Sequence, residues 1–179
     1  GHSDGTAGAV VSTRDRIDRI WETARNLGGS LNAQICYLLE RSLKTLHVRV
    51  KTQNKNALQV ARHLESHKKI QKVWYPGLES HVGHEIAQKQ MRGFGGMLSF
   101  EPASDSIIAF QQNLELIRPA VSLGGIDSTI CSPMLTSHKG LSQEEREEQG
   151  ISDSMLRLSV GIEHPDDLIR DLDRALEKM

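Results

Sequence analysis

The segment Leu156-Arg157-Leu158-Ser159-Val160-Gly161-Ile162-Glu163 alternates apolar and polar side chains up to a glycine. This alternation predicts a half-buried β-strand, because successive side chains of a strand point to opposite faces of the sheet. Downstream, Leu168, Leu172 and Leu176 recur at helical spacing and predict a helix over residues 165–177. A strand that leads directly into a helix is typical of a sheet covered by helices.

The rest of the chain extends this mixed pattern toward the N-terminus. Helices are predicted over residues 13–27, 30–46, 54–66, 83–91 and 104–113, and β segments at residues 9–11, 73–75 and 97–100. Ser142 with Glu145 has the spacing of a capping box and predicts a helix start, whereas residues 122–140 are rich in turn signals. Together these elements predict an α/β or α+β fold in which helices cover a small sheet.

Composition narrows the class of protein. The 179 residues are 37% hydrophobic and 25% charged with a formal charge of -1, which fits a globular chain and not the basic face of a nucleic-acid binder. No apolar run is long enough to predict a membrane span. Cys36 and Cys131 lack the spacing of a zinc or redox motif, so we expect two reduced thiols in a cytoplasmic protein.

Two features are candidates for ligand binding. Arg157 lies on the polar side of its predicted strand, and a guanidinium fork binds a carboxylate through two parallel hydrogen bonds. A surface salt bridge explains the same pattern and is the commoner role. The second feature is the segment from Val121 to His138, where hydroxyls stand beside Gly124 and Gly125, although an ordinary surface turn explains it equally well.

No metal site is predicted. His63 and His67 are four residues apart on one helical face, but Lys68 and Lys69 adjoin them and would repel a cation. A solvated helix face explains the pair better. The glycine-rich residues 93–96 lead into a strand and not into a helix, so they predict a tight turn and not a phosphate-binding loop.

Six segments, taken in order, carry a resemblance to a known family. They are Gly1-His2-Ser3-Asp4, Leu43-Lys44-Thr45-Leu46, Trp74-Tyr75-Pro76-Gly77-Leu78-Glu79-Ser80-His81, Gly93-Phe94-Gly95-Gly96-Met97-Leu98-Ser99-Phe100, Ser122-Leu123-Gly124-Gly125 and Arg157-Leu158-Ser159-Val160-Gly161-Ile162-Glu163. The chain resembles the Cys/Met metabolism family of pyridoxal-phosphate enzymes, which includes cystathionine gamma-synthase, cystathionine gamma-lyase and methionine gamma-lyase. The resemblance covers essentially the whole chain.

The resemblance implies a fold and a division into domains. The fold would be the aspartate-aminotransferase type, called fold type I. Residues 1–46 would form the tail of the large cofactor domain with a bridging helix, and residues 47–179 the C-terminal small domain. The full-length enzyme would use pyridoxal phosphate for β/γ-elimination or γ-replacement on a sulfur amino acid. It would be a homo-oligomer, a tetramer in the family, without nucleic-acid or membrane partners.

The resemblance also implies roles for individual residues. Arg157 would bind the substrate α-carboxylate. Ser122, followed by Leu123, would lie near the substrate and the cofactor lysine, and Ser137 would support the carboxylate site. The Schiff-base lysine would precede Gly1-His2-Ser3-Asp4, so no catalytic or cofactor-binding residue is expected in these 179 residues, and the chain alone is expected to be inactive.

Three points stay open at the level of sequence. Val121 resembles the methionine gamma-lyases, whereas Gly28-Gly29 favours the gamma-synthase or gamma-lyase branch, so the particular reaction is not assigned. The first alternative function is a non-catalytic truncated subunit or oligomerisation module. The second alternative is an α/β domain unrelated to the family, for which Arg157 would serve stability alone.

Overall fold

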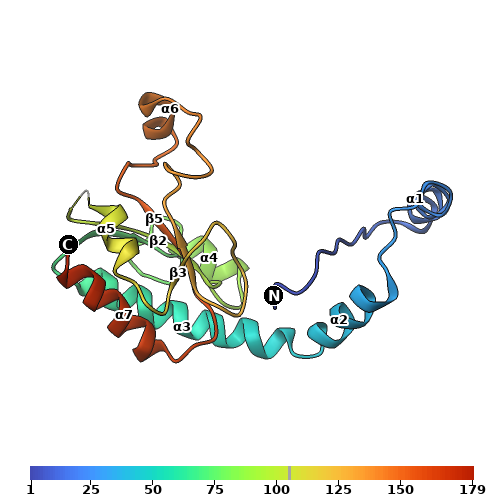
Figure 1. Ribbon diagram of the computed structural model, residues 1–179, viewed down its shortest axis with the longest axis horizontal. Coiled ribbons are helices and arrows are strands. Elements are labelled where there is room, and N and C mark those ends of the chain that lie inside the picture. Colours follow the sequence, from blue (N-terminus) through green and yellow to red (C-terminus); the bar gives the residue numbers. More distant parts are fainter. Residues whose placement is uncertain (105) are drawn as a thin grey trace. The chain divides into compact units, whose positions relative to one another are not determined.

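The computed structural model describes residues 1–104 and 106–179 (Figure 1). These form two compact units, Gly1–His47 and Val48–Met179. The elements follow in the order α1 (Arg14–Leu27), α2 (Ala33–Leu43), α3 (Leu46–Ser66), β1 (Ile70–Trp74), α4 (His84–Gln90), β2 (Met97–Pro102), α5 (Ile107–Gln112), β3 (Arg118–Pro119), β4 (Thr129–Cys131), α6 (Gln143–Glu148), β5 (Leu156–Ser159) and α7 (Pro165–Glu177). The predicted mixture of helices with a small sheet is confirmed.

The sheet of the second unit has the strand order β1-β2-β5-β4-β3. Strand β5 pairs antiparallel with β2 on one side and with β4 on the other, while the short β3 runs parallel to β4. The strand predicted from the alternating segment therefore occupies the centre of the sheet. A central strand is bonded along both edges, which makes it a rigid support for the side chains it carries.

One face of this sheet packs on helices α3 and α7 and forms the core (Figure 1). Leu156 and Leu158 of β5 are fully buried there, beside Leu98 and Phe100 of the paired strand β2. Helix α7 contributes the leucines that the helical spacing predicted, and it begins with Pro165 at its first turn behind the N-cap His164. The alternation of the sequence thus places every second residue of β5 on the opposite side of the strand.

In the first unit, two sequence predictions are wrong. Residues 9–11 form no strand, and Val11 is 94% exposed, because this short apolar run has no neighbouring strand among the described residues to satisfy its backbone groups. The helix predicted from residue 30 begins at Ala33 and ends at Leu43. Asn32, and not Ser30, caps it, since the Asn32 side chain accepts the N–H of Ile35 at 2.9 Å.

Other boundaries shift for local reasons. The helix predicted from residue 54 starts already at Leu46, because no glycine or proline interrupts residues 46–54. The helix predicted over residues 30–46 ends at Leu43, and of that range only Leu46 belongs to α3. The helix predicted over residues 104–113 is the shorter α5, and residue 105 of that range lies outside the described residues. Strand β4 was missed inside the turn-rich segment, because three residues are too few to show a period.

The tight turn predicted before β2 is confirmed, and a buried tyrosine holds it. The Tyr75 hydroxyl donates to the carbonyl of Gly95 at 2.9 Å, and Gly95 adopts a positive φ of 84°. Burial raises the pKa of Tyr75 to about 12. The hydroxyl therefore keeps its proton over the whole neutral range and remains a donor to the turn.

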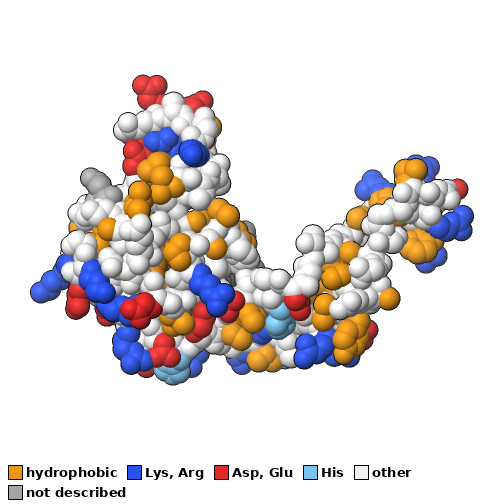
Figure 2. Space-filling model, viewed as in Figure 1, with side chains coloured by type: hydrophobic (Ala, Val, Ile, Leu, Met, Phe, Trp, Pro, Cys, Tyr) orange, Lys and Arg blue, Asp and Glu red, His pale blue; other side chains and the backbone are white. Residues whose placement is uncertain are grey.

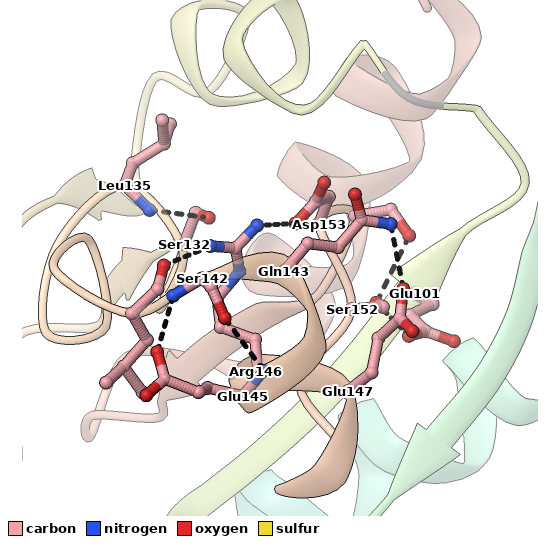
Figure 3. A network of polar contacts seen from close by, with 12 residues as sticks. Glu101, Ser132, Leu135, Ser142, Gln143, Glu145, Arg146, Glu147, Ser152 and Asp153 are labelled. Atoms are coloured by element: carbon pink, nitrogen blue, oxygen red, sulfur yellow. Dashed lines mark hydrogen bonds and ion pairs between the residues drawn. The ribbon is translucent and has the colours of Figure 1, made fainter.

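Between β4 and β5 the chain makes an excursion that carries α6. Ser142 and Glu145 form the predicted capping box, and Arg146 fixes the excursion by donating to the carbonyl of Leu141 at 2.8 Å and to Asp153 at 2.7 Å (Figure 3). Acidic side chains gather at the end of this excursion (Figure 2).

Among the described residues, no helix is long and apolar enough to cross a membrane.

Candidate functional site

The side of β5 opposite Leu156 and Leu158 carries Arg157 and Ser159. Arg157 stands opposite Ser99 of β2 and opposite Cys131 of β4, and directly opposed residues of paired strands share a face. Leu156 and Leu158 occupy the other face, inside the core. The register of the sheet therefore directs the guanidinium away from the core.

On that side, Arg157 meets the segment that precedes the predicted serine. Its Nη2 donates a hydrogen bond to the carbonyl of Val121 at 2.8 Å. Its Nε is shielded from solvent and has no hydrogen-bond partner among the described residues. The Nε atoms of Arg146 and Arg174 are shielded and unpaired in the same way, so Arg157 is distinguished as a candidate for an anionic ligand by its place on the central strand beside the loop. The side chain is half-buried, so the guanidinium remains accessible to such a ligand.

The loop next to Arg157 is held by hydrogen bonds at several points. The N–H of Gly124 donates to the Ser159 hydroxyl at 2.8 Å, and Thr129 Oγ1 donates to the carbonyl of Ser122 at 2.6 Å. From helix α3, Gln53 Nε2 donates to the carbonyl of Gly125 at 2.6 Å. Gly124 has a positive φ of 72°, which a residue with a side chain rarely adopts. These hydrogen bonds therefore fix the conformation of the loop beside the guanidinium.

The structure brings some of the predicted site residues together. Ser122 and Leu123 are exposed and directly follow Val121, the backbone partner of Arg157. Ser137 is exposed in the turn after β4, where its hydroxyl shares a hydrogen bond with His138 Nδ1 at 2.8 Å. In the part of the chain that is described, no hydrogen bond joins Ser137 to Arg157. The binding roles of these four residues remain predictions.

Sequence reasoning missed two residues that shape this loop. Ser159 follows Arg157 by two positions, and the period of a strand was sufficient to place both on one face. Gln53 lies 72 residues before its partner Gly125, and no local pattern indicates that contact. Both residues are buried, at 2% and 8% exposure, and their hydrogen bonds to the loop are partly shielded from water.

The histidine pair lies against an acidic residue of helix α7. His63 Nε2 lies 2.6 Å from an oxygen of Asp173 on α7, and His67 Nε2 lies 3.8 Å from the same oxygen. No group of three or more potential ligands capable of holding a metal ion occurs within the described residues. Cys36 and Cys131 are both free, as the sequence predicted. Arg157 and its loop therefore remain the candidate site.

Solved structures define the class of this fold. The chain superimposes on cystathionine gamma synthase from Xanthomonas oryzae pv. oryzae, solved in complex with cystathionine, with a TM-score of 0.90 and 38% identity over 99% of this chain and 47% of that one. Cystathionine gamma-lyase from Lactobacillus plantarum, complexed with L-serine, gives a TM-score of 0.85 at 36% identity over 94% and 45% of the two chains. The fold is that of fold type I pyridoxal-phosphate enzymes.

Residues 1–177 match the family described as Cys/Met metabolism PLP-dependent enzyme, and the chain belongs to that family. Cystathionine beta-lyase of Lactococcus lactis subsp. cremoris is 43% identical over 180 residues, which are 99% of this chain and 47% of that protein. Cystathionine gamma-synthase 1, chloroplastic, of Nicotiana tabacum is 42% identical over all of this chain and 34% of that protein. The chain spans less than half the length of these relatives.

Proposed function

We propose that this chain is the C-terminal part of an enzyme that breaks or replaces a bond at the β- or γ-carbon of a sulfur amino acid, and that Arg157 binds the substrate α-carboxylate. One observation carries the proposal. The central strand carries the Arg157 guanidinium on the side away from the core, half-buried beside a defined loop whose Val121 carbonyl accepts from its Nη2 at 2.8 Å. A carboxylate matches this donor set, because its two oxygens accept parallel N–H bonds from the fork.

The residues around Arg157 suit the substrate better than the cofactor. Pyridoxal phosphate, when bound, accepts electrons from the amino acid so that its α-proton can leave. Its aldehyde requires an amine, whereas the described polar contacts around Arg157 and its loop come from hydroxyl, amide and backbone groups and not from a lysine. We therefore propose that this chain binds the substrate, and that the remainder of the protein provides the lysine and the other cofactor contacts.

Ser122, Leu123 and Ser137 complete the proposed substrate site. The Ser122 hydroxyl is exposed while its carbonyl is fixed by Thr129, so the side chain is available to a ligand on the Arg157 side. Leu123 is 54% exposed, and an apolar ligand would cover it. Ser137 lies in the turn that follows β4, and we propose that it supports the carboxylate once a substrate is present.

The reaction itself is tested with cystathionine and the full-length protein. Elimination at the β-carbon releases pyruvate, ammonia and homocysteine, whereas elimination at the γ-carbon releases 2-oxobutyrate, ammonia and cysteine. Measuring the two oxo acids separates a β-lyase from a γ-lyase, and thioether formation from an activated homoserine and cysteine identifies a synthase. Absence of all three activities, and of 2-oxobutyrate release from methionine, in a cofactor-loaded protein would contradict the proposal.

The 179 residues alone are expected to show no turnover. The proposed cofactor lysine lies outside them, and without that amine no group holds the aldehyde or moves the α-proton. To test this, pyridoxal phosphate is added to the purified chain, and the cofactor absorbance and the release of oxo acid are measured. A stoichiometric band that maps to one lysine, accompanied by turnover, would refute this expectation. The full-length protein is the positive control.

A second candidate, an oligomerisation module, is favoured by the apolar surface of the first unit. Helices α1 and α2 contain no buried residue, and Trp21 and Leu27 are 63% and 83% exposed. Such side chains are normally covered by further polypeptide. We propose that other subunits cover them within a cytoplasmic homotetramer of the full-length protein. A stable monomer of the full-length protein in a size-exclusion mass measurement would exclude the tetramer.

A further inference from the structure

The loop beside Arg157 is fastened at its far end to the corner that joins β5 to α7. Ser128 is fully buried there, and its N–H donates to Glu163 Oε1 at 2.6 Å while its hydroxyl donates to Glu163 Oε2 at 2.9 Å. The same hydroxyl accepts the N–H of Gly161 at 2.9 Å. Both oxygens of one carboxylate are therefore used to hold a single loop residue, through charge-assisted bonds.

The corner that carries Glu163 is itself fixed. Asn56 of helix α3, 2% exposed, donates from Nδ2 to the carbonyls of Glu163 at 2.7 Å and of Gly161 at 3.3 Å. The N–H of Ile162 donates to the carbonyl of Ile126 at 2.9 Å. At Gly161 a methyl group would overlap the carbonyl oxygen of Ile126 and the Glu163 carboxylate, so only glycine permits this approach. The loop and the corner thus interlock.

We propose that Glu163 is a positioning residue for substrate binding, an inference that rests on the proposed function of Arg157. Glu163 does not touch Arg157. It acts through Ser128, which ends the loop whose first residue, Val121, accepts the guanidinium bond at 2.8 Å. The loop contains Gly124 and Gly125, so it has other conformations available once the buried Ser128 loses its partners. Arg157 would then lose the backbone acceptor that orients its fork.

The test compares Glu163→Ala with Glu163→Gln in the full-length, cofactor-loaded protein. Alanine removes both acceptors of Ser128. Glutamine keeps an oxygen for the Ser128 N–H, and its amide can donate to the Ser128 hydroxyl, which has a free lone pair. We expect alanine to raise KM for the amino-acid substrate about five- to tenfold with kcat within about twofold, and glutamine to restore most of the binding.

A readout independent of turnover is backbone hydrogen exchange over residues 121–129. Glu163→Ala is expected to exchange faster there than the parent protein, and Glu163→Gln is expected to resemble the parent. Asp173→Ala is the matched control, because it removes a carboxylate of α7 that contacts His63 and that, among the described residues, makes no hydrogen bond to the loop. It should leave both KM and exchange in the loop unchanged. Ser128→Ala, which deletes only the hydroxyl bonds, replaces Glu163→Ala if that variant does not fold.

A double-mutant cycle separates this inference from the function on which it rests. If Glu163 acts through Arg157, adding Glu163→Ala to Arg157→Ala raises KM no further. An unchanged KM in Glu163→Ala, or a rise of the same size in both backgrounds, overturns the positioning role while the carboxylate role of Arg157 stands. If Arg157→Ala alone has no effect, the proposed carboxylate site is wrong and the positioning role falls with it.

Discussion

Arg157→Ala in the full-length protein is expected to lower kcat/KM by about 30- to 150-fold, which corresponds to about 2–3 kcal/mol for a lost charge-assisted carboxylate contact. The loss is expected mainly in binding of the amino acid, because the guanidinium donates to the carboxylate in both the ground state and the transition state. Steady-state kinetics with cystathionine measure the effect. Arg157→Lys retains the charge without the planar fork, so its kcat/KM should lie between that of the parent protein and that of Arg157→Ala.

Folding should change little in the same variant. The bond from Arg157 to Val121 uses an exposed residue of the loop, and water can replace the lost donor. Arg170→Ala is the matched control, since that side chain is 76% exposed on α7 and pairs only at the surface with Asp167. The assignment would be contradicted if Arg170→Ala lost as much catalytic efficiency as Arg157→Ala. It would also be contradicted if Arg157→Ala were strongly destabilised while its folded fraction kept normal kinetics.

The largest expected effect on stability is that of Asp171→Ala, about 2–4 kcal/mol lost from the free energy of unfolding. The Asp171 carboxylate is 5% exposed and accepts three backbone N–H groups, from Glu115 at 2.9 Å, Leu116 at 3.0 Å and Ile117 at 2.9 Å. Arg174 pairs with it from the same helix. Alanine would leave these donors and the guanidinium without their common acceptor, and urea unfolding of the full-length protein measures the cost.

Helix α7 supplies its own control for this prediction. Asp173 lies two positions along the helix and pairs with His63, but its side chain is 36% exposed. Asp173→Ala is expected to cost no more than about 1 kcal/mol, because solvent screens a partly exposed pair. Equal destabilisation by the two substitutions would show that the segment from Glu115 to Ile117, which leads into β3, does not depend on the buried carboxylate.

Local pattern was sufficient for much of the fold. The alternation around Arg157 predicted β5, the leucines four apart predicted α7, and Ser142 with Glu145 predicted the capping box of α6. These signals depend on neighbours within a few residues, so they can be read from the chain directly. The same rule explains the failures. The apolar residues 9–11 suggested a strand, but a strand requires a partner that local sequence cannot provide.

The sequence by itself determined the family, through six ordered segments, and the face of the strand on which Arg157 stands, through a period of two. Only the tertiary structure decided which loop meets that face. The bonds from Gln53 to Gly125 and from Glu163 to Ser128 join residues 72 and 35 positions apart. Contacts at such separations arise from packing of the whole unit, because many loop conformations satisfy the same local sequence and only the assembled sheet and helices select one of them.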